Sequence, residues 1–316
     1  MNAKHSFRAT STVSRSAGMT RFIKAHGTQN DFVFIVDPTV TVDLNEDRVR
    51  RIADRHAGIG GDGVIRVATA ASLIDANVLD PNILQPDPEN PRATIHEDEW
   101  FMDYRNADGS IAEMCGNGVR AFAHVLIAEK LIGGGEPKFP IEIGVGTRAG
   151  RKIVKIHEAD AQQAKVSVDM GRPVVTGMST ASIGGFNLAG LGVDMGNPHL
   201  AAIIPNLTAE KLAELPIGEK VTWDEEFFPT GVNVEVATPL EDGAVHMRVH
   251  ERGVGETRSC GTGTVATAVA ALADAGKEFG TVVVRVPGGE VEVDITADTA
   301  VLTGPSQIVA RGEMSC

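Results

Sequence analysis

Cysteine is scarce in this sequence and shows none of the spacings that structural roles require. The chain has three cysteines among 316 residues, an odd number, with no Cys-x-x-Cys pair and no Cys/His cluster at metal-ligand spacing. This excludes a disulfide-stabilised scaffold and a structural zinc site. We therefore expect no bound metal and a different use for the cysteines.

Basic charge and long apolar runs are lacking as well. Lys and Arg number 29 against 42 Asp and Glu, which leaves a formal net charge of −13. Nucleic acids and anionic membranes attract proteins through basic patches, so we expect neither as a partner. No apolar stretch approaches the roughly 18 residues that a membrane-spanning helix needs.

The N-terminal segment lacks the apolar core of a secretory signal. Its first 18 residues are rich in Ser, Thr and Arg, whereas a signal peptide needs an apolar stretch there. We expect a flexible extension at residues 1–19 and a cytoplasmic protein. A basic, transit-like segment is the alternative for this extension.

Aromatic residues are few, with 11 Phe, 2 Trp and 1 Tyr, whereas glycine is abundant at 35 residues. So many glycines indicate many turns, and the 42% of apolar residues is enough to form a core. Short segments of alternating polarity, such as 231–236 and 245–250, are typical of half-buried strands. These features favour a mixed α/β (α+β) fold with many short strands.

Two of the three cysteines stand in copies of one motif. Cys115-Gly116-Asn117-Gly118 precedes the mostly apolar segment 119–128, and Cys260-Gly261-Thr262-Gly263 precedes the apolar segment 265–273. A helix with almost no polar face must be covered on every side. Because a repeated unit indicates a duplicated architecture, we expect two pseudosymmetric domains, each a curled, mostly antiparallel sheet around a central helix.

The repeat also suggests domain limits. We expect an N-terminal domain containing Cys115 at residues 20–158 plus 306–316, and a C-terminal domain containing Cys260 at residues 159–305. The polar segment 158–163 would be the crossing between them. The acidic, proline-rich stretch 71–100 is expected to be a surface insertion between adjacent strands, with no chemistry of its own.

The two motifs suit acid–base chemistry at one carbon. A lone cysteine is more often a small buried apolar residue than a nucleophile, but two in the same setting are hard to explain in that way. Free N–H groups and the positive end of the dipole at a helix N-terminus both favour a thiolate. A thiolate on one face of a carbon and a thiol on the other could remove and return a proton, which inverts the centre.

The carbanion that such a reaction forms must be stabilised. Many enzymes use pyridoxal phosphate for this purpose, but the sequence holds no strong cue for a Schiff-base lysine. We therefore expect no cofactor. Backbone N–H groups at the two helix N-termini could hold a substrate carboxylate instead.

Six motifs, in order over about residues 20–311, resemble the diaminopimelate epimerase family. The resemblance implies a cofactor-independent interconversion of LL- and meso-diaminopimelate in lysine and cell-wall precursor synthesis, two pseudosymmetric domains, and a homodimer. The motifs are His26-Gly27-Thr28-Gln29-Asn30-Asp31-Phe32, Asn106-Ala107-Asp108-Gly109-Ser110, Cys115-Gly116-Asn117-Gly118, Gly196-Asn197-Pro198-His199, Glu251-Arg252-Gly253-Val254-Gly255-Glu256-Thr257 and Cys260-Gly261-Thr262-Gly263.

The resemblance also implies roles for single residues. Cys115 and Cys260 would be the acid/base pair, and His199 and Glu251 would adjust the pKa values of the two thiols. Two positions depart from the family pattern, which commonly has Gly at Gln29 and Gln at Gly63. The residues implied in substrate binding are Asn30, Asn106, Gly116, Asn117, Asn197, Asn233, Glu251, Arg252, Gly261 and Thr262.

Two other readings stay open. A proline racemase-like isomerase shares the two-thiol logic, although such enzymes typically carry His where Asn117 stands. A thiol redox or ligand-binding protein could use the same fold without catalysis. Exchange of a substrate Cα–H with solvent deuterium separates an epimerase from a protein that merely binds.

Overall fold

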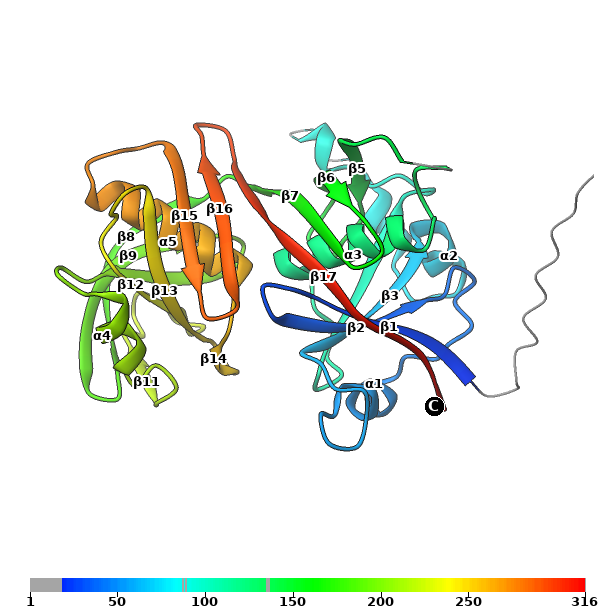
Figure 1. The fold of residues 1–316 in the computed structure, drawn as a ribbon, viewed down its shortest axis with the longest axis horizontal. Helices are drawn as coiled ribbons and strands as arrows, with labels where there is room; N and C mark the ends of the chain where they lie inside the picture. The colour runs from blue at the N-terminus through cyan, green and yellow to red at the C-terminus, as the bar shows by residue number, and fades with distance from the viewer. Residues whose placement is uncertain (1–18, 87, 89, 135–136, 316) are drawn as a thin grey trace, which may run out of the picture.

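Each half of the chain builds one sheet around one long helix, and the two halves form the two lobes seen in Figure 1. The computed structural model describes residues 19–86, 88, 90–134 and 137–315. Met19 begins the first strand. The rest of the predicted N-terminal extension lies outside the described residues, as does Cys316.

The elements of the first half, in chain order, are β1 (Met19–Gly27), β2 (Asn30–Val36), α1 (Glu46–Ala53), β3 (Gly63–Thr69), α2 (Ala70–Asp75), the 3-10 turns η1 (Pro81–Leu84) and η2 (Pro91–Ala93), β4 (Trp100–Asn106), α3 (Gly116–Ala128), β5 (Ile141–Val145), β6 (Lys152–Ala159) and β7 (Gln163–Gly171). Those of the second half are β8 (Val174–Ile183), β9 (Phe186–Asp194), β10 (Pro198–Ile203), α4 (Ala209–Glu214), β11 (Val221–Trp223), β12 (Asn233–Ala237), β13 (Ala244–Glu251), β14 (Gly255–Thr257), α5 (Gly261–Asp274), β15 (Gly280–Val286), β16 (Gly289–Ile295) and β17 (Ala300–Ser315).

The two halves pair their strands in the same order. In the first half β1–β2 is antiparallel, β2–β3 parallel, and β3–β4, β5–β6 and β6–β7 antiparallel. In the second half β9–β10 is antiparallel, β10–β12 parallel, and β12–β13, β15–β16 and β16–β17 antiparallel. These groups of strands are joined by a parallel pairing in each half. In the second half β13 pairs with β15, and in the first half a single bridge joins Phe101 of β4 to Gly146, which follows β5. The predicted mixed α/β class, with a curled sheet around a helix in each half, is confirmed.

Helices α3 and α5 fill the two curled sheets. Every residue from 116 to 127 of α3 is buried, and so are most residues of α5. Cys115 and Cys260 are the N-cap residues, and neither side chain makes a capping hydrogen bond. Each thiol therefore stands beside backbone N–H groups that have no partner within their own helix.

Strand β17 joins the lobes. It pairs with β16 over residues 300–303, with β1 from 307 to 315, and with β7 along its other edge. Figure 1 shows it crossing from one lobe to the other. Residues 300–315 thus form one continuous strand that serves both lobes. Pro305 lies where β16 ends and β1 begins, so its missing N–H leaves no bond unmade on that edge.

Residues 158–163, which we predicted to be the crossing between domains, form a hairpin instead. β6 and β7 pair antiparallel on both sides of this turn, and β7 packs against α3. β8 is the first strand whose partners all lie in the second half. The domain limits stay a proposal, and these pairings favour a crossing at residues 172–173 rather than at 158–159.

The insertion at 71–100 has more structure than the solvated loop we expected. It joins β3 to β4, which are adjacent as predicted, but it contains most of α2 and both 3-10 turns. Leu73, Leu79 and Ile95 are buried and pack with Phe101 in a small cluster of their own. Two of its four prolines, Pro81 and Pro91, begin the 3-10 turns, where a missing N–H is harmless.

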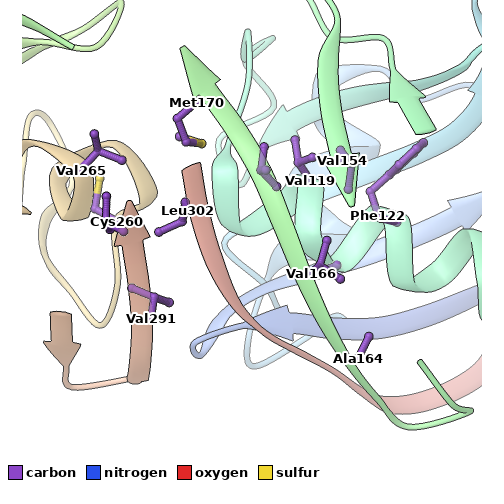
Figure 2. Packing of buried hydrophobic residues seen from close by; sticks show 14 of the residues in the cluster. Val119, Phe122, Val154, Ala164, Val166, Met170, Cys260, Val265, Val291 and Leu302 are labelled. Atoms are coloured by element: carbon purple, nitrogen blue, oxygen red, sulfur yellow. The ribbon is translucent and has the colours of Figure 1, made fainter. Parts of the chain in front are cut away.

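Apolar side chains from both lobes form one core beneath the two helix starts. Figure 2 shows Met170 of β7 and Leu302 of β17 between Cys260 at the start of α5 and Val119 of α3. At Gly116 a Cβ would lie 2.9 Å from Met170 Cε and 3.6 Å from Leu302 Cδ2. The lobes therefore share packing where their helices begin, and Gly116 makes this close approach possible.

Candidate functional site

The N-termini of α3 and α5 meet where the lobes join. A Cβ built on Gly261 would lie 3.3 Å from Gly116 Cα and 3.5 Å from the backbone nitrogen of Asn117. Because each helix dipole is positive at this end, two positive ends face one region that contains both cysteines. That region favours a bound anion.

The Cys115 thiol takes part in a hydrogen-bond network of asparagine side chains. Its Sγ donates to Asn30 Oδ1 at 3.3 Å, and Asn117 Nδ2 donates to the same oxygen at 3.2 Å. Asn30 in turn donates through Nδ2 to Asp62 Oδ2 at 2.7 Å. These bonds hold the partly buried thiol in one orientation above the first turn of α3.

Several groups act on the pKa of Cys115. Burial raises this pKa to about 11, and the Glu251 carboxylate also raises it. The N–H groups of Gly118 and Asn117 and the guanidinium of Arg120 act in the opposite direction. The thiol therefore needs these donors to become a usable base.

Cys260 lies in a more negative and more enclosed setting. It is 7% exposed, and its Sγ lies 3.6 Å from Thr262 Oγ1. Burial and the charges of Glu251 and Glu235 raise the pKa of Cys260 well above its ordinary value. Burial also raises the pKa of Glu251, against hydrogen bonds from Thr257 and Cys260. The two carboxylates beside Cys260 therefore favour its protonated thiol.

A fully buried His–Glu pair supports the Cys260 helix. His199 Nδ1 lies 2.7 Å from Glu235 Oε1, and its Nε2 lies 3.1 Å from Asn197 Oδ1. A Cβ on Gly263 would overlap the Glu235 carboxylate, so only glycine fits there. We did not predict a role for Glu235. Its place in an alternating strand looks ordinary in the sequence, and the signal is that a strand residue buried on every side is charged.

The remaining predicted residues of the second half are brought to the same region. Asn197 Nδ2 donates to Thr262 Oγ1 at 3.4 Å. Asn233 donates to Pro198 O at 3.1 Å and accepts from the backbone of Arg252 at 2.9 Å. Asn233 therefore fixes the backbone that carries Glu251 and Arg252.

The Arg252 side chain is exposed and anchored at one nitrogen. Its Nη1 donates to the carbonyl oxygen of Thr230 at 2.8 Å and to the Thr230 hydroxyl at 3.2 Å. This contact fixes one edge of the guanidinium beside the strand end that carries Glu251. The anchored arginine therefore places a positive charge at the rim of the candidate site.

Asn106 lies at the matching strand end in the first half. It ends β4 opposite Gly63 and donates to Ser110 Oγ at 3.0 Å. A Cβ on Gly63 would overlap the ring of Tyr104 and the carbonyl of Arg105. The departure from the family pattern at Gly63 therefore has a physical cause, because Tyr104 fills the space beside it.

Side chains that we did not predict tie the lobes together. Thr28 Oγ1 and Ser259 Oγ lie 2.8 Å apart, and Asn117 Nδ2 donates to Ser259 Oγ at 3.2 Å. Gln29 Oε1 accepts from Arg258 at 2.5 Å. These residues lie more than a hundred positions apart in sequence, so no local pattern could have paired them. Ser259 directly precedes Cys260, which places this network in the site.

The described part of the chain contains no group of His, Cys, Asp and Glu side chains that could hold a metal ion. Within the same residues, no helix has the length and apolar character to cross a bilayer.

The fold recurs in solved structures of other proteins. A phenazine biosynthesis protein of the PhzF family from Bacillus anthracis matches with a TM-score of 0.62 at 14% identity, over 94% of this chain and 99% of that one. A hydroxyproline epimerase from Agrobacterium vitis, solved with trans-4-hydroxy-L-proline, matches with a TM-score of 0.60 at 14% identity, over 94% and 91%. These matches show that the chain has a duplicated α/β fold that is shared with those proteins.

The sequence profile of diaminopimelate epimerase matches residues 22–176 and 191–309. The chain belongs to the diaminopimelate epimerase family, as the six motifs predicted. The enzyme of that name from Corynebacterium glutamicum (strain R) is 54% identical over 293 residues, 93% of this chain and 97% of that protein. The enzymes from Corynebacterium aurimucosum and Mycobacterium ulcerans are 56% and 52% identical, covering 93% of this chain and 99% and 96% of their own lengths.

Proposed function

We propose that this chain interconverts LL-2,6-diaminopimelate and meso-diaminopimelate by moving a proton at one Cα between two cysteine thiols, without a cofactor. The two-thiol part is supported by the close approach of the two helix starts at Gly116 and Gly261, because Cys115 and Cys260 are the N-cap residues of these helices. Membership of the family supports the substrate. The reaction is an isomerisation, and its product serves lysine and peptidoglycan precursor synthesis.

In this mechanism the two thiols work in opposite protonation states. A thiolate takes the Cα proton from one face, and the opposite thiol gives its proton to the other face. One C–H bond breaks as another forms, so the carbon is inverted and atoms and charge balance. The negative charge ends on the sulfur that gave its proton, and the cysteines therefore titrate as a pair.

The carbanion is stabilised by donors that are already in place. We assign the substrate α-carboxylate to the facing N-termini of α3 and α5, where Gly116, Asn117, Gly261 and Thr262 offer backbone N–H groups. Donors that are oriented before the reaction stabilise developing charge without rearranging. This takes the part that the electron sink of pyridoxal phosphate plays in other amino-acid enzymes.

Polar side chains around the thiols complete the proposal. Asn30, Asn106, Asn197 and Asn233 stand at strand ends or beside the two helix starts, with Glu251 and Arg252 at the end of β13. The planar guanidinium of Arg252 suits a carboxylate of the substrate. His199, through Glu235, and Glu251 adjust the pKa of Cys260.

We also propose that the protein acts in the cytoplasm as a homodimer. Resemblance to the family supports both statements. Sedimentation of the purified protein over a range of concentrations checks the assembly, and a single monomeric species at all concentrations would contradict it.

The function is tested by following the Cα–H of the substrate in deuterium oxide. LL-diaminopimelate incubated with the protein should lose its Cα–H signal and give the meso isomer, with no added pyridoxal phosphate and with a metal chelator present. L-proline and trans-4-hydroxy-L-proline serve as matched controls. Exchange of either control but not of diaminopimelate favours a proline racemase-like isomerase, and no exchange with any of them favours a non-catalytic protein.

A further inference from the structure

Arg120 is a buried charge without a carboxylate partner. Its side chain is fully buried on the second turn of α3. Nη2 donates to Thr28 Oγ1 at 3.1 Å, and Nε donates to Pro305 O at 3.4 Å. Nη1 has no hydrogen-bond partner among the described residues. A guanidinium taken out of water with only neutral acceptors loses more than these bonds return.

Other buried polar groups in the same lobe show that this arrangement is unusual. Arg66 is as deeply buried, but Asp37 lies 3.7 Å and Asp103 lies 4.0 Å from its Nε. His124, one turn after Arg120, has Ser306 Oγ at 3.1 Å and Asp160 O at 3.1 Å on its two nitrogens. Arg120 alone of these three has a positive charge with neither a carboxylate nor a full set of hydrogen bonds.

The surrounding backbone leaves room for this guanidinium. A Cβ on Gly27 would lie 2.9 Å from Arg120 Nη2, and a Cβ on Gly304 would lie 3.3 Å from its Cζ. Two glycines from two different strands thus make space for one side chain. In the second motif the same step of five residues from the cysteine leads to Val265, which is fully buried in the core. A buried valine therefore satisfies the packing at this position of the motif, so packing does not explain the positive charge of Arg120.

The anion available to Arg120 is the thiolate of Cys115. Arg120 lies on the helix whose N-cap residue is Cys115, and Thr28, which accepts from Arg120, also contacts Ser259. Asn117 donates to Ser259 and also to Asn30 Oδ1, the acceptor of the Cys115 thiol. Burial lowers the pKa of Arg120 to about 10, and the charge of Cys115 raises it. The same attraction lowers the pKa of Cys115. Other charged or titratable groups that face Cys115 are Glu251 from β13 and Tyr104 from β4. Cys260 faces Glu235 and Glu251, both negative.

We propose that Arg120 is a positioning residue that decides which thiol of the pair ionises first, and that it places this first negative charge on Cys115 while Cys260 keeps its proton. The proposal rests on the two-thiol mechanism. It gives the two equivalent cysteines different starting roles: the substrate-free protein is ready for the epimer whose Cα–H faces Cys115. After each turnover in that direction the proton has to return from Cys115 to Cys260.

Alkylation of substrate-free protein by iodoacetamide across a pH series tests this order. The two cysteines fall in separate tryptic peptides, residues 106–120 and 259–277, so mass mapping gives one pH midpoint for each. In the unaltered protein the midpoint of Cys115 should lie below that of Cys260. In Arg120→Met, where the first peptide extends to residue 130, the Cys115 midpoint should rise by about one pH unit or more, a tenfold change in thiolate at fixed pH.

Two further variants separate charge from structure. Arg120→Lys keeps a positive charge and should keep most of the difference between the two midpoints. Thr28→Ala removes a hydrogen-bond partner of Arg120 but no charge, and should leave the Cys115 midpoint in place. A structural role alone would move both cysteines together in Arg120→Met, or move Cys115 in Thr28→Ala as well.

The proposal can fail independently of the function. A lower midpoint for Cys260 than for Cys115 in the unaltered protein overturns it, and that measurement does not depend on any variant folding. An unchanged Cys115 midpoint in folded Arg120→Met also overturns it. If the protein still exchanges the Cα–H of diaminopimelate in either case, the two-thiol mechanism stands and only the role of Arg120 is lost.

Discussion

The N-termini of α3 and α5 have the same backbone arrangement but pack against different side chains. Beneath Gly118, a Cβ would lie 3.4 Å from Ile65 Cδ1 and 3.5 Å from Phe32 Cζ, an apolar pair. Beneath the equivalent Gly263 lies Glu235, paired with His199. The strand registers agree, because β2 and β3 align Phe32 with Gly63 as β10 and β12 align His199 with Asn233.

This difference teaches how a duplicated fold makes two unequal acids. Both halves supply a cysteine and free N–H groups at a helix start. Arg120 is then added near one thiol, and Glu235 with His199 near the other. Repetition of the backbone provides the geometry for attack from two faces, and the few side chains that break the repetition set the pKa of each thiol.

The largest expected effect comes from removing either thiol. Cys115→Ala and Cys260→Ala should each lower kcat for epimerisation by ~10⁴-fold or more, at or above the upper end for loss of a general acid or base. Cys316→Ala, outside the described residues, is the matched control and should leave the rate unchanged. Near-normal turnover in either of the first two variants would contradict the two-thiol mechanism.

The next largest effect is expected when the polar pair beneath Gly263 is replaced by the apolar pair found beneath Gly118. Glu235→Ile alone leaves the buried His199 Nδ1 without its hydrogen-bond partner and should lower the free energy of unfolding by about 1–3 kcal/mol, the usual cost of an unsatisfied buried polar group. Adding His199→Phe recreates the apolar pair and should restore much of that loss. Urea unfolding of the single and double variants measures this. Equal stability of the two variants would show that an apolar pair cannot replace the His199–Glu235 pair beneath Gly263.

A single methyl group should distinguish the two equivalent glycines. Gly263→Ala would push the Glu235 carboxylate aside and should cost about 1–3 kcal/mol of stability, the usual range for overpacking, with a loss of activity. Gly118→Ala meets only ordinary contacts, and should change stability by less than about 1 kcal/mol. Thermal unfolding of the two variants under the same conditions measures this difference, and equal losses of stability would contradict it.

The smallest expected effect is a difference in alkaline stability. Folding raises the pKa of Cys115 to about 11 and that of Cys260 well above its ordinary value. In the unfolded chain a cysteine has a pKa of about 8.5, so the stability contributed by each protonated thiol is fully present below that pH. That contribution is lost as the pH rises through the folded values. Between pH 8.5 and 11, Cys260→Ala should therefore lose less stability than the unaltered protein. Cys115→Ala should show a smaller change in the same direction.

Much of the architecture was predictable from the sequence because it depends on local patterns. The two Cys-Gly-x-Gly motifs predicted the starts of α3 and α5. The Gly-rich turns and alternating segments predicted short strands. The family motifs predicted membership, since each one is specific and their order adds to it.

What could not be predicted depends on contacts between distant segments. Glu235 reads as an ordinary strand residue until the helix start is packed on it, and Thr28 pairs with Ser259 across 231 positions. The hairpin at 158–163 was wrong as a crossing because its polar residues fit a tight turn as well as a linker. The small core of the insertion was missed because its apolar residues are spread among prolines and acidic residues.

The last strand sets a limit on the order in which this protein can be completed during synthesis. β17 comes last in chain order among the described elements, and three earlier strands, β1, β7 and β16, pair with it. Until β17 is synthesised, both lobes have sheet edges without this partner, and such edges invite pairing with other chains. The nascent first half cannot therefore finish on its own and wait, although domains generally fold in order from the N-terminus. A chain that ends early by a dozen residues keeps the pairing of β17 with β16 at residues 300–303 but loses its pairing with β1 at residues 307–315.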